Sequence, residues 1–218
     1  MYIIKTPNFI QSLFPNFVWR MNMEESKTIY LTFDDGPIPE VTPWVLDVLQ
    51  QFNAKATFFC VGDNVRKHPE IFQRLRAEGH LVGNHTYNHI SGWNTDNIPY
   101  FHNVRKCARL VRSGLFRPPY GRLKPQQVQF LQRHYKIVMW DVLSADFDRD
   151  TTPQQCLQNV LTHTQAGSIV VFHDSVKAFT NLQYALPRCL EYFGNLGYKF
   201  QTINENSLVS EANSKKIA

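Results

Sequence analysis

Short apolar runs rich in β-branched and aromatic residues recur along the chain and alternate with amphipathic segments. The runs are short for buried helices, and their composition is typical of strands that are covered on both faces. They lie at residues 28–33, 56–61, 81–83, 136–140, 168–172 and 198–202. The pattern therefore predicts a set of buried strands.

Segments with apolar residues at helical spacing lie between these runs, at 39–52, 69–78, 97–111, 124–134, 153–164 and 178–196. A strand followed by a helix, several times over, is typical of parallel βα units. The chain has 218 residues and no internal repeat, low-complexity tract or long linker. We therefore expect a single α/β domain, built as one barrel or one open sheet.

The N-terminal segment carries apolar residues at helical spacing, although Pro15 falls inside the pattern. We expect residues 1–27 to form an extension that packs on the domain, with membrane-surface contact as the weaker alternative. The first apolar run ends at Thr6 and Pro7 and lacks the features of a cleavable signal. Since no run approaches the ~20 apolar residues that span a bilayer, we expect no transmembrane segment and a cytoplasmic protein by default, with export by another route as the alternative.

The composition narrows the class of protein. Hydrophobic residues make up 43% of the chain and charged residues 19%, which excludes a disordered chain and a membrane bundle. The formal net charge is +5, but the basic residues are scattered, which favours a solvated surface over nucleic-acid binding. The four cysteines lie far apart without a C-x-x-C pair, so we expect reduced core residues rather than a zinc knuckle or redox pair.

Polar residues that could carry out chemistry stand directly after the predicted strands. They are Asp34 with Asp35, His85 with His89, Asp146, and His173 with Asp174. In βα barrels the loops that leave the carboxyl ends of the strands converge on one face. The positions therefore predict one shared site.

Two of these groups suggest a metal-assisted hydrolysis. Asp34 and Asp35 end an apolar run, where one carboxylate could bind a metal while the other acts as a base. His85 and His89 are four residues apart, which brings both imidazoles to one face of a helical turn. With Asp35 they complete a three-ligand set with open positions, the pattern of catalytic zinc. Each group taken alone is more often a polar turn or a hydrogen-bonded loop histidine.

Two further groups add weaker signals. Arg117 begins the segment R-P-P-Y-G, whose prolines stiffen the backbone, although a single arginine there is more often a surface ion-pair partner. His173 ends a buried strand, where it could protonate a leaving amine if a carboxylate orients it.

The order of these motifs resembles a known family. T-F-D-D-G-P, H-T-Y-N-H, R-P-P-Y-G, the S-A-D-F segment and V-F-H-D are similar to the polysaccharide deacetylases with a NodB-homology domain, carbohydrate esterase family 4. The resemblance implies a distorted (β/α) barrel at residues 28–205, followed by a polar tail at 206–218. It also implies an enzyme that hydrolyses N-acetyl groups of N-acetylglucosamine-type sugars in a poly- or oligosaccharide and releases acetate.

The resemblance also implies a role for each matching residue. Asp34 is then the general base and His173 the general acid, while Arg117 orients the base and Asp146 tunes the acid. The metal ligands are then Asp35, His85 and His89, around one divalent ion, most simply Zn²⁺, with Co²⁺ or another transition metal as alternatives. The resemblance places the backbone N–H of Tyr120 beside the developing oxyanion.

Two positions depart from the family pattern. Phe147 stands where the family usually has tryptophan, and Val171 stands where it usually has leucine. Both positions line the family's pocket for the acetyl methyl group. Because both replacements are smaller but hydrophobic, we expect catalysis to survive and acyl preference to differ.

Two other functions compete with this interpretation. The absent signal and the apolar N-terminal segment favour a deacylase or deformylase of a lipid-linked or small soluble amino sugar. A noncatalytic carbohydrate-binding protein would also keep the fold, but the complete set of predicted catalytic residues favours an enzyme.

Overall fold

The strands of the computed structural model, which describes residues 2–21 and 27–203, are short. They are β1 (Phe17–Val18), β2 (Thr28–Asp34), β3 (Thr57–Cys60), β4 (Leu81–Asn84), β5 (Leu115–Phe116), β6 (Lys136–Val138), β7 (Val142–Leu143), β8 (Ile169–His173) and β9 (Lys199–Phe200). All pairs between them are parallel.

The helices follow the strands along the chain. They are α1 (Asn8–Leu13), α2 (Thr42–Gln51), α3 (Gly62–Lys67), α4 (Pro69–Ala77), α5 (Asn97–Val111), α6 (Pro125–Leu131), α7 (Pro153–His163) and α8 (Phe179–Asn195), with a short 3₁₀ turn, η1 (Pro119–Gly121). Six of them match the predicted helical segments to within about three residues at either end. Pro15 lies beyond the end of α1, as expected for a residue that cannot continue a helix.

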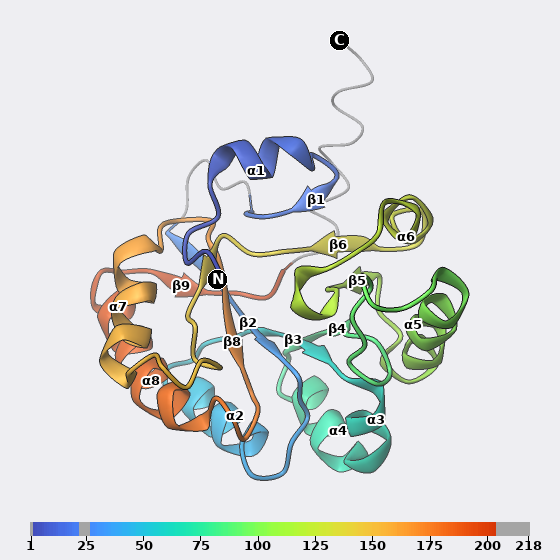
Figure 1. Ribbon diagram of the computed structural model, residues 1–218. Coiled ribbons are helices and arrows are strands. Elements are labelled where there is room, and N and C mark those ends of the chain that lie inside the picture. Colours follow the sequence, from blue (N-terminus) through green and yellow to red (C-terminus); the bar gives the residue numbers. More distant parts are fainter. Residues whose placement is uncertain (1, 22–26, 204–218) are drawn as a thin grey trace, which may run out of the picture.

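The sheet has the strand order β1-β6-β5-β4-β3-β2-β8-β7, and β9 pairs with the start of β2. It curls into a half-barrel with α2 to α8 around its outer side (Figure 1). This curled parallel sheet confirms the α/β fold of the distorted-barrel type. Three strands, β1, β5 and β7, and helix α3 were not predicted, because two-residue strands and a six-residue helix are too short to show a periodicity.

Strand β2 lies at the centre of the sheet, between β3 and β8, and all seven of its residues are buried. Side chains alternate between the two faces of a strand. Ile29, Leu31 and Phe33 join the core under the helices. Thr32 and Asp34 therefore point to the opposite face, into the curl of the sheet.

The register of the three central strands is fixed by aromatic contacts. The ring of Phe33 stacks on Phe58 of β3 at 4.9 Å and on Phe172 of β8 at 6.0 Å between centroids. Both contacts join residues that are register partners. One position further along, Asp34 is the register partner of His173. The packing of the core thus brings the last residue of β2 beside the last residue of β8.

The N-terminal segment contacts both ends of the sheet. Strand β1 pairs with β6, and Lys5 forms an antiparallel bridge with Val142 of β7. The ammonium of Lys5 also lies 2.6 Å from the buried carboxylate of Asp141. Residues 206–218, where we predict a polar tail, lie outside the described residues.

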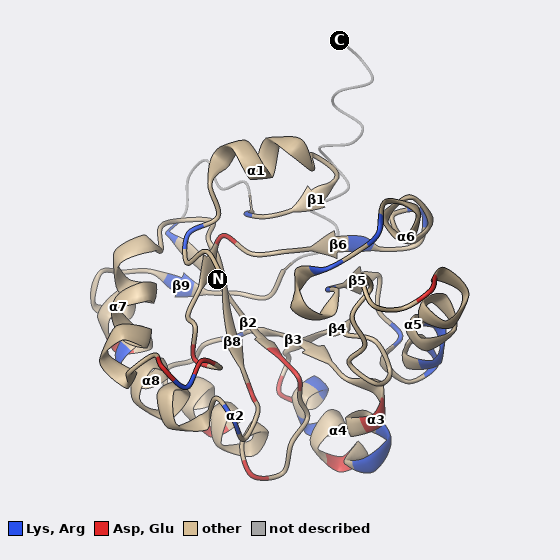
Figure 2. Cartoon of the chain, viewed as in Figure 1, with Lys and Arg blue, Asp and Glu red and all other residues tan. Residues whose placement is uncertain are grey.

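The composition also led to predictions about the cysteines, the basic residues and membrane-spanning segments. All four cysteines are free and buried, as expected for reduced core residues. Lys and Arg are spread over several helices and strands rather than gathered in one stripe (Figure 2). Among the described residues, no helix has the length and apolar character needed to cross a membrane.

Candidate active site

The carboxylate of Asp34 forms a buried ion pair with Arg117. Arg117 Nη1 donates to Asp34 Oδ1 at 2.7 Å and to Thr32 Oγ1, also at 2.7 Å. Both acceptors belong to the inner face of β2, because Thr32 and Asp34 are two residues apart on one strand. Arg117 follows β5, which is three strands away from β2 in the sheet order. The ion pair between Arg117 and Asp34 therefore spans the concave side of the curled sheet.

The guanidinium of Arg117 is fully buried and has several other partners. It donates to the carbonyls of Val138 at 3.2 Å and Met139 at 2.8 Å, and it lies 4.1 Å from the centroid of the Phe59 ring. A buried arginine with this many fixed contacts cannot change rotamer without leaving donors unpaired. It therefore holds Asp34 in one orientation.

A second cluster lies next to Asp34. Ligand-type atoms of Asp35, His85 and His89 all lie within 4.8 Å of one another. Asp35 Oδ1 is 3.1 Å from His89 Nε2 and 3.9 Å from His85 Nε2. This oxygen is buried without a hydrogen bond of good geometry. An orphaned carboxylate oxygen facing two imidazole nitrogens is the arrangement that a bound cation would satisfy.

The backbone of Arg117 fixes the orientation of one of these imidazoles. His85 Nδ1 lies 2.8 Å from the Arg117 carbonyl, so this nitrogen carries the proton and Nε2 is left to face Asp35. Burial, the largest effect, lowers the pKa of His85 to about 4. His85 is therefore neutral at neutral pH, the form that ligates metals. One residue thus contacts both Asp34 and the three-residue cluster.

The carboxylate of Asp35 is also held in its charged form. Burial favours the neutral acid, but the contact with His89 and the neighbouring imidazoles outweigh it and lower the pKa of Asp35 below its usual range. Asp35 is thus suited to ligate a cation.

The loop with the two histidines differs from the expected helical turn. Residues 85–91 form no helix, and Thr86 and His89 have φ values of 62° and 54°. The expectation of a helical turn is therefore wrong, although both rings do reach one place. The cause is Asn84, whose side chain accepts from the Thr86 N–H at 2.9 Å and donates to the Val104 carbonyl, which pins the turn to α5.

His173 is oriented by Asp146. The two carboxylate oxygens of Asp146 lie 2.7 Å from the His173 backbone N and 2.8 Å from its Nδ1. Burial by itself lowers the pKa of His173, but the charge and hydrogen bond of Asp146, with two further carboxylates, raise it to about 9. His173 is therefore an imidazolium at neutral pH, with Nε2 free of the Asp146 bond.

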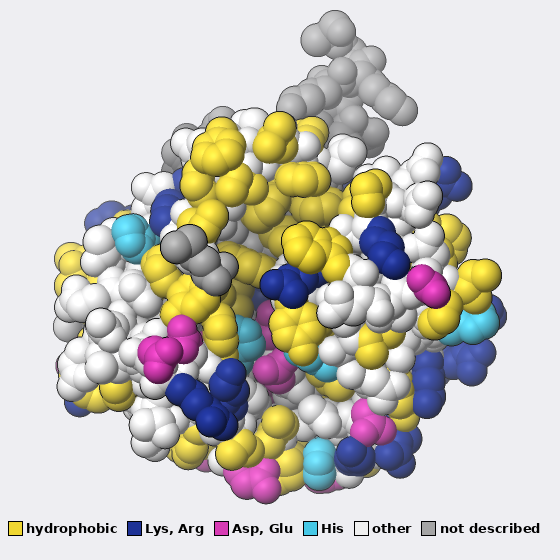
Figure 3. Space-filling model, viewed as in Figure 1, with side chains coloured by type: hydrophobic (Ala, Val, Ile, Leu, Met, Phe, Trp, Pro, Cys, Tyr) yellow, Lys and Arg dark blue, Asp and Glu magenta, His cyan; other side chains and the backbone are white. Residues whose placement is uncertain are grey.

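These side chains occupy the floor of a hollow on one face of the molecule. Figure 3 shows acidic and histidine side chains there, with hydrophobic and basic side chains around the rim.

A family model described as polysaccharide deacetylase matches residues 22–136. The chain belongs to the polysaccharide deacetylase family.

Relatives of the chain extend this match. Two Bacillus cereus proteins named peptidoglycan-N-acetylglucosamine deacetylase are 35% identical over 67% of this chain and 31% identical over 86% of it. The matches span 56% and 91% of those relatives, so the chain covers little more than half of the first. A Bradyrhizobium chitooligosaccharide deacetylase is 36% identical over 73% of this chain and 78% of its own length.

Solved structures of related proteins share the fold of this chain. The Bc1960 peptidoglycan N-acetylglucosamine deacetylase has a TM-score of 0.83 and 30% identity, and the match covers 91% of this chain and 95% of that one. A Bacillus anthracis pseudoenzyme of the same family has a TM-score of 0.75, with 85% of this chain and 66% of that one covered, at 24% identity. Family membership therefore leaves turnover to be argued from the site residues.

The remaining predicted site residues border the same hollow of this family member. The Phe147 ring packs edge-on against His173 at 5.1 Å between centroids. Val171 is buried on β8, two residues before His173 and on the same face. The exposed ring of Tyr120 packs on His89 at 4.8 Å, and φ of Tyr120 is 61°. Nine of the ten predicted residues thus lie on loops or strand ends around one place, and Val171 lies in the middle of β8, on the face that leads to it.

One residue that supports the site was not assigned a role from the sequence. Asp174 follows His173 but points away from it, accepting from the Gly36 N–H at 3.0 Å and from Thr42 Oγ1 at 2.6 Å. Burial is the main cause that raises the pKa of Asp174 to about 8. Asp174 thus fastens the turn that carries Asp35, whose φ is 87°. The adjacent His173-Asp174 pair gave no signal that the two side chains diverge.

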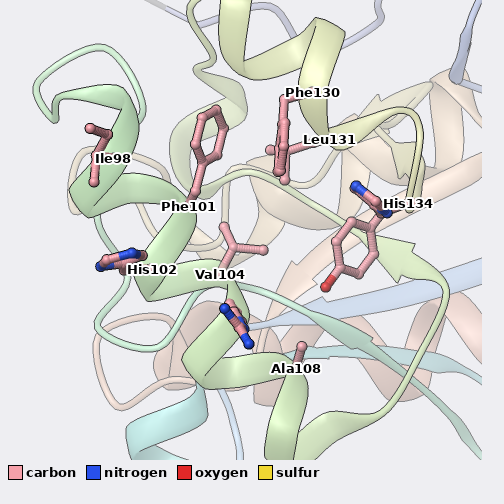
Figure 4. A pocket seen from close by; sticks show the side chains of 10 residues that line it. Ile98, Phe101, His102, Val104, Ala108, Phe130, Leu131 and His134 are labelled. Carbon is pink, nitrogen blue, oxygen red and sulfur yellow. The ribbon is translucent and has the colours of Figure 1, made fainter.

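A pocket of this family member lies apart from these residues. It has a volume of about 550 Å³ and is formed between α5 and the region of α6. Figure 4 shows side chains such as Phe101, Val104 and Leu131 around it. No carboxylate lines it, so the residue types needed for hydrolysis lie in the hollow instead.

Replacing Gly36 by alanine tests the packing beneath the turn. A Cβ at Gly36 would overlap the carboxylate of Asp174. We expect Gly36→Ala to lower the free energy of unfolding by about 1–3 kcal/mol, as overpacking does. Urea denaturation measures the loss. The control is Gly194→Ala in α8, where the added Cβ meets no atom within 4 Å; equal stability of the two variants would show that the turn is not packed as described.

Proposed function

We propose that the chain hydrolyses the N-acetyl group of N-acetylglucosamine-type sugars in a poly- or oligosaccharide and releases acetate. The observation that carries the proposal is the pairing of Asp34 with His173 across β2 and β8, next to the cluster of Asp35, His85 and His89. A carboxylate and an imidazolium beside a cluster of metal-ligating residues provide a base, an acid and a place for the acyl oxygen. The deacetylase names of the relatives support the same reaction class.

We propose that Asp35, His85 and His89 hold one divalent ion, most simply zinc. Two imidazoles and one carboxylate are the donor set of several catalytic zinc sites, and they leave coordination positions open. The orphaned oxygen of Asp35 and the proton on His85 Nδ1 both fit this role. When bound there, zinc would polarise the acetamide carbonyl and lower the pKa of water toward about 7. Co²⁺ or another transition metal would suit the same donors.

Separate residues of the chain carry out the two proton transfers of the reaction. Asp34, held by Arg117, takes a proton from the attacking water. The backbone N–H of Tyr120 stabilises the oxyanion that forms on the acetyl group. His173, held by Asp146, gives its Nε2 proton to the sugar nitrogen, so that the C–N bond breaks and a neutral amine leaves. Acetate and a free amino sugar are the products.

Phe147 and Val171 form one wall of the acyl pocket in this proposal. Both are apolar and lie beside His173. The acetyl methyl group would then be shielded from water next to the acid. Because Phe147 is smaller than tryptophan and Val171 smaller than leucine, the pocket has room for a somewhat larger acyl group.

The alternatives make different demands on the site. A deacylase or deformylase of a lipid-linked or small amino sugar would use the same base and acid, so the assay has to compare substrates. A noncatalytic binder has no use for the ion pair of Asp34 with Arg117 or for a charged His173. These two features favour an enzyme.

Acetate release tests the proposed function directly. The zinc-loaded protein is assayed on peptidoglycan, chitooligosaccharides, acetylated xylan and small N-acetylated or N-formylated sugars, with formate measured beside acetate. We expect acetate from the N-acetylated glycans and, in Asp34→Asn with an unchanged circular dichroism spectrum, a loss of about 100-fold or more in turnover. No acetate from any N-acetylated glycan, or undiminished release by Asp34→Asn, would rule the proposal out.

Metal content tests the proposed ligands separately. We expect His89→Ala to bind zinc at least about ten-fold more weakly than the unchanged protein, because it removes one of three ligands. Elemental analysis after dialysis against a series of zinc buffers gives the affinity. His134→Ala removes an exposed histidine outside the cluster and should bind zinc normally. Undiminished zinc in both His85→Ala and His89→Ala would refute the assignment.

The pH profile tests the role of Asp146. His173 is active as an acid only while protonated, so activity falls as pH rises through its pKa. Asp146 is the largest cause that raises this pKa. Asp146→Asn should therefore move the alkaline limb of kcat/KM to lower pH, whereas Asp150→Asn, at an exposed position nearby, should leave it in place. An unmoved alkaline limb in Asp146→Asn would mean that another group is the acid.

A further inference from the structure

Two side chains on the loops that follow His89 and Tyr120 have no part in the reaction described above. Trp93 is 58% exposed, although a tryptophan gains more from burial than any other residue. Arg122 is exposed and forms no salt bridge with any carboxylate of residues 2–21 and 27–203. The Arg122 guanidinium lies over the Trp93 ring, 5.0 Å from its centroid. The two side chains therefore form one exposed aromatic and cationic unit.

The orientation of this unit is fixed. Trp93 Nε1 donates to the Leu123 carbonyl at 3.1 Å. Gln127 Nε2 donates to the Gly92 carbonyl at 3.0 Å, and Lys124 Nζ donates to the Thr95 carbonyl at 3.0 Å. These bonds fasten the turn at residues 91–95 to the segment at 122–127. An indole that is held in place but left in solvent loses little conformational entropy when it binds a partner.

Glycine at position 92 allows this close contact. A Cβ there would meet the side chain of Gln127 and the backbone of Arg122 and Leu123. The turn therefore lies directly against the segment that bears the arginine. Any side chain at position 92 would push Trp93 and Arg122 apart.

The unit is continuous with the active site. Trp93 follows His89 by four residues, which span at most about 14 Å of chain. Arg122 follows Tyr120 by two residues, and the rings of Tyr120 and His89 are in contact at 4.8 Å. Trp93 and Arg122 thus lie on the two loops that meet beside the cluster of Asp35, His85 and His89. A ligand of two or more sugars can therefore contact the site and the unit together.

We propose that Trp93 and Arg122 form a subsite for the sugar next to the one that is deacetylated, and that this sugar carries a carboxylate. The indole packs against the apolar face of the sugar ring, and the guanidinium binds the carboxylate, the group that its fork geometry matches. The inference rests on the proposed function. It favours a glycan in which N-acetylglucosamine alternates with an amino sugar that bears a free carboxylate on an ether substituent, as in peptidoglycan strands whose carboxylates are not joined to peptides, over an uncharged homopolymer.

A matched pair of substrates isolates the charge. One is a peptide-free tetrasaccharide of alternating N-acetylglucosamine and N-acetylmuramic acid with free carboxylates, and the other is the same tetrasaccharide with each carboxylate converted to a methyl amide. We expect the zinc-loaded protein to prefer the charged form in kcat/KM by about ten-fold or more, the scale of a hydrogen bond to a charged group. Arg122→Gln should abolish this preference, so that the charged and amidated forms react at equal rates.

A control arginine and a truncated substrate complete the test. Arg188→Gln removes an exposed guanidinium that lies 3.9 Å from the Tyr184 ring centroid on α8, and it should keep the preference. Trp93→Ala should lower kcat/KM on the tetrasaccharides by a larger factor than on a single N-acetylglucosamine derivative. Equal rates of the unchanged protein on the charged and amidated forms, or equal losses on both in Arg122→Gln, would overturn the proposal.

Binding measurements test the subsite independently of the proposed reaction. Isothermal titration of the charged and amidated tetrasaccharides is carried out on the same proteins. Charge-dependent binding that Arg122→Gln abolishes, without acetate release from any glycan, would support the subsite and refute the proposed function. Acetate release without charge-dependent rates or binding would support the function and refute the subsite.

Discussion

The buried guanidinium of Arg117 is the constraint on which the rest of the site depends. Its side chain donates to Asp34, Thr32 and two backbone carbonyls, and its own carbonyl meets the Nδ1 of His85. A buried charge is costly unless it is paired and fully hydrogen-bonded, so this arrangement has few alternatives of similar energy. The proposed base and one proposed metal ligand are thereby fixed relative to each other before any substrate binds.

The loops around this pair are held in backbone conformations that L-residues adopt rarely. Asp35, Thr86, His89, Tyr120 and Ala145 all have positive φ values between 54° and 87°. Such conformations persist only where the surroundings impose them, and here buried polar anchors do so. Asn84 fixes the histidine turn, and Asp174 fixes the turn after β2. The sheet brings the loops of the site together, and the hydrogen bonds of Asn84 and Asp174 fix the backbone conformation of two of these loops.

Sequence patterns predicted parallel βα units with polar residues gathered after the strands, because strand periodicity and loop convergence are general properties of βα folds. The distorted-barrel form and the places of Tyr120, Phe147 and Val171 were predicted from the resemblance to the family. Local geometry could not be predicted in this way. The spacing of His85 and His89 suggested a helical turn, whereas the tertiary bonds of Asn84 hold a non-helical loop in which Thr86 and His89 have positive φ. Nor could the spacing show whether Asp146 or the adjacent Asp174 orients His173, because that choice depends on contacts between distant strands. The pair of Trp93 and Arg122 gave no sequence signal, since its two members lie on separate loops.

The central claim is that the side chain of Arg117 organises the base while its backbone supports the metal cluster. Acetate release and zinc content of Arg117→Lys test it most directly, because lysine keeps the charge and the backbone carbonyl but lacks the fork of donors. We expect zinc binding close to that of the unchanged protein and a loss of about 10–100-fold in turnover, typical for a supporting partner of a site residue. Turnover near the original value, with zinc bound, would contradict it.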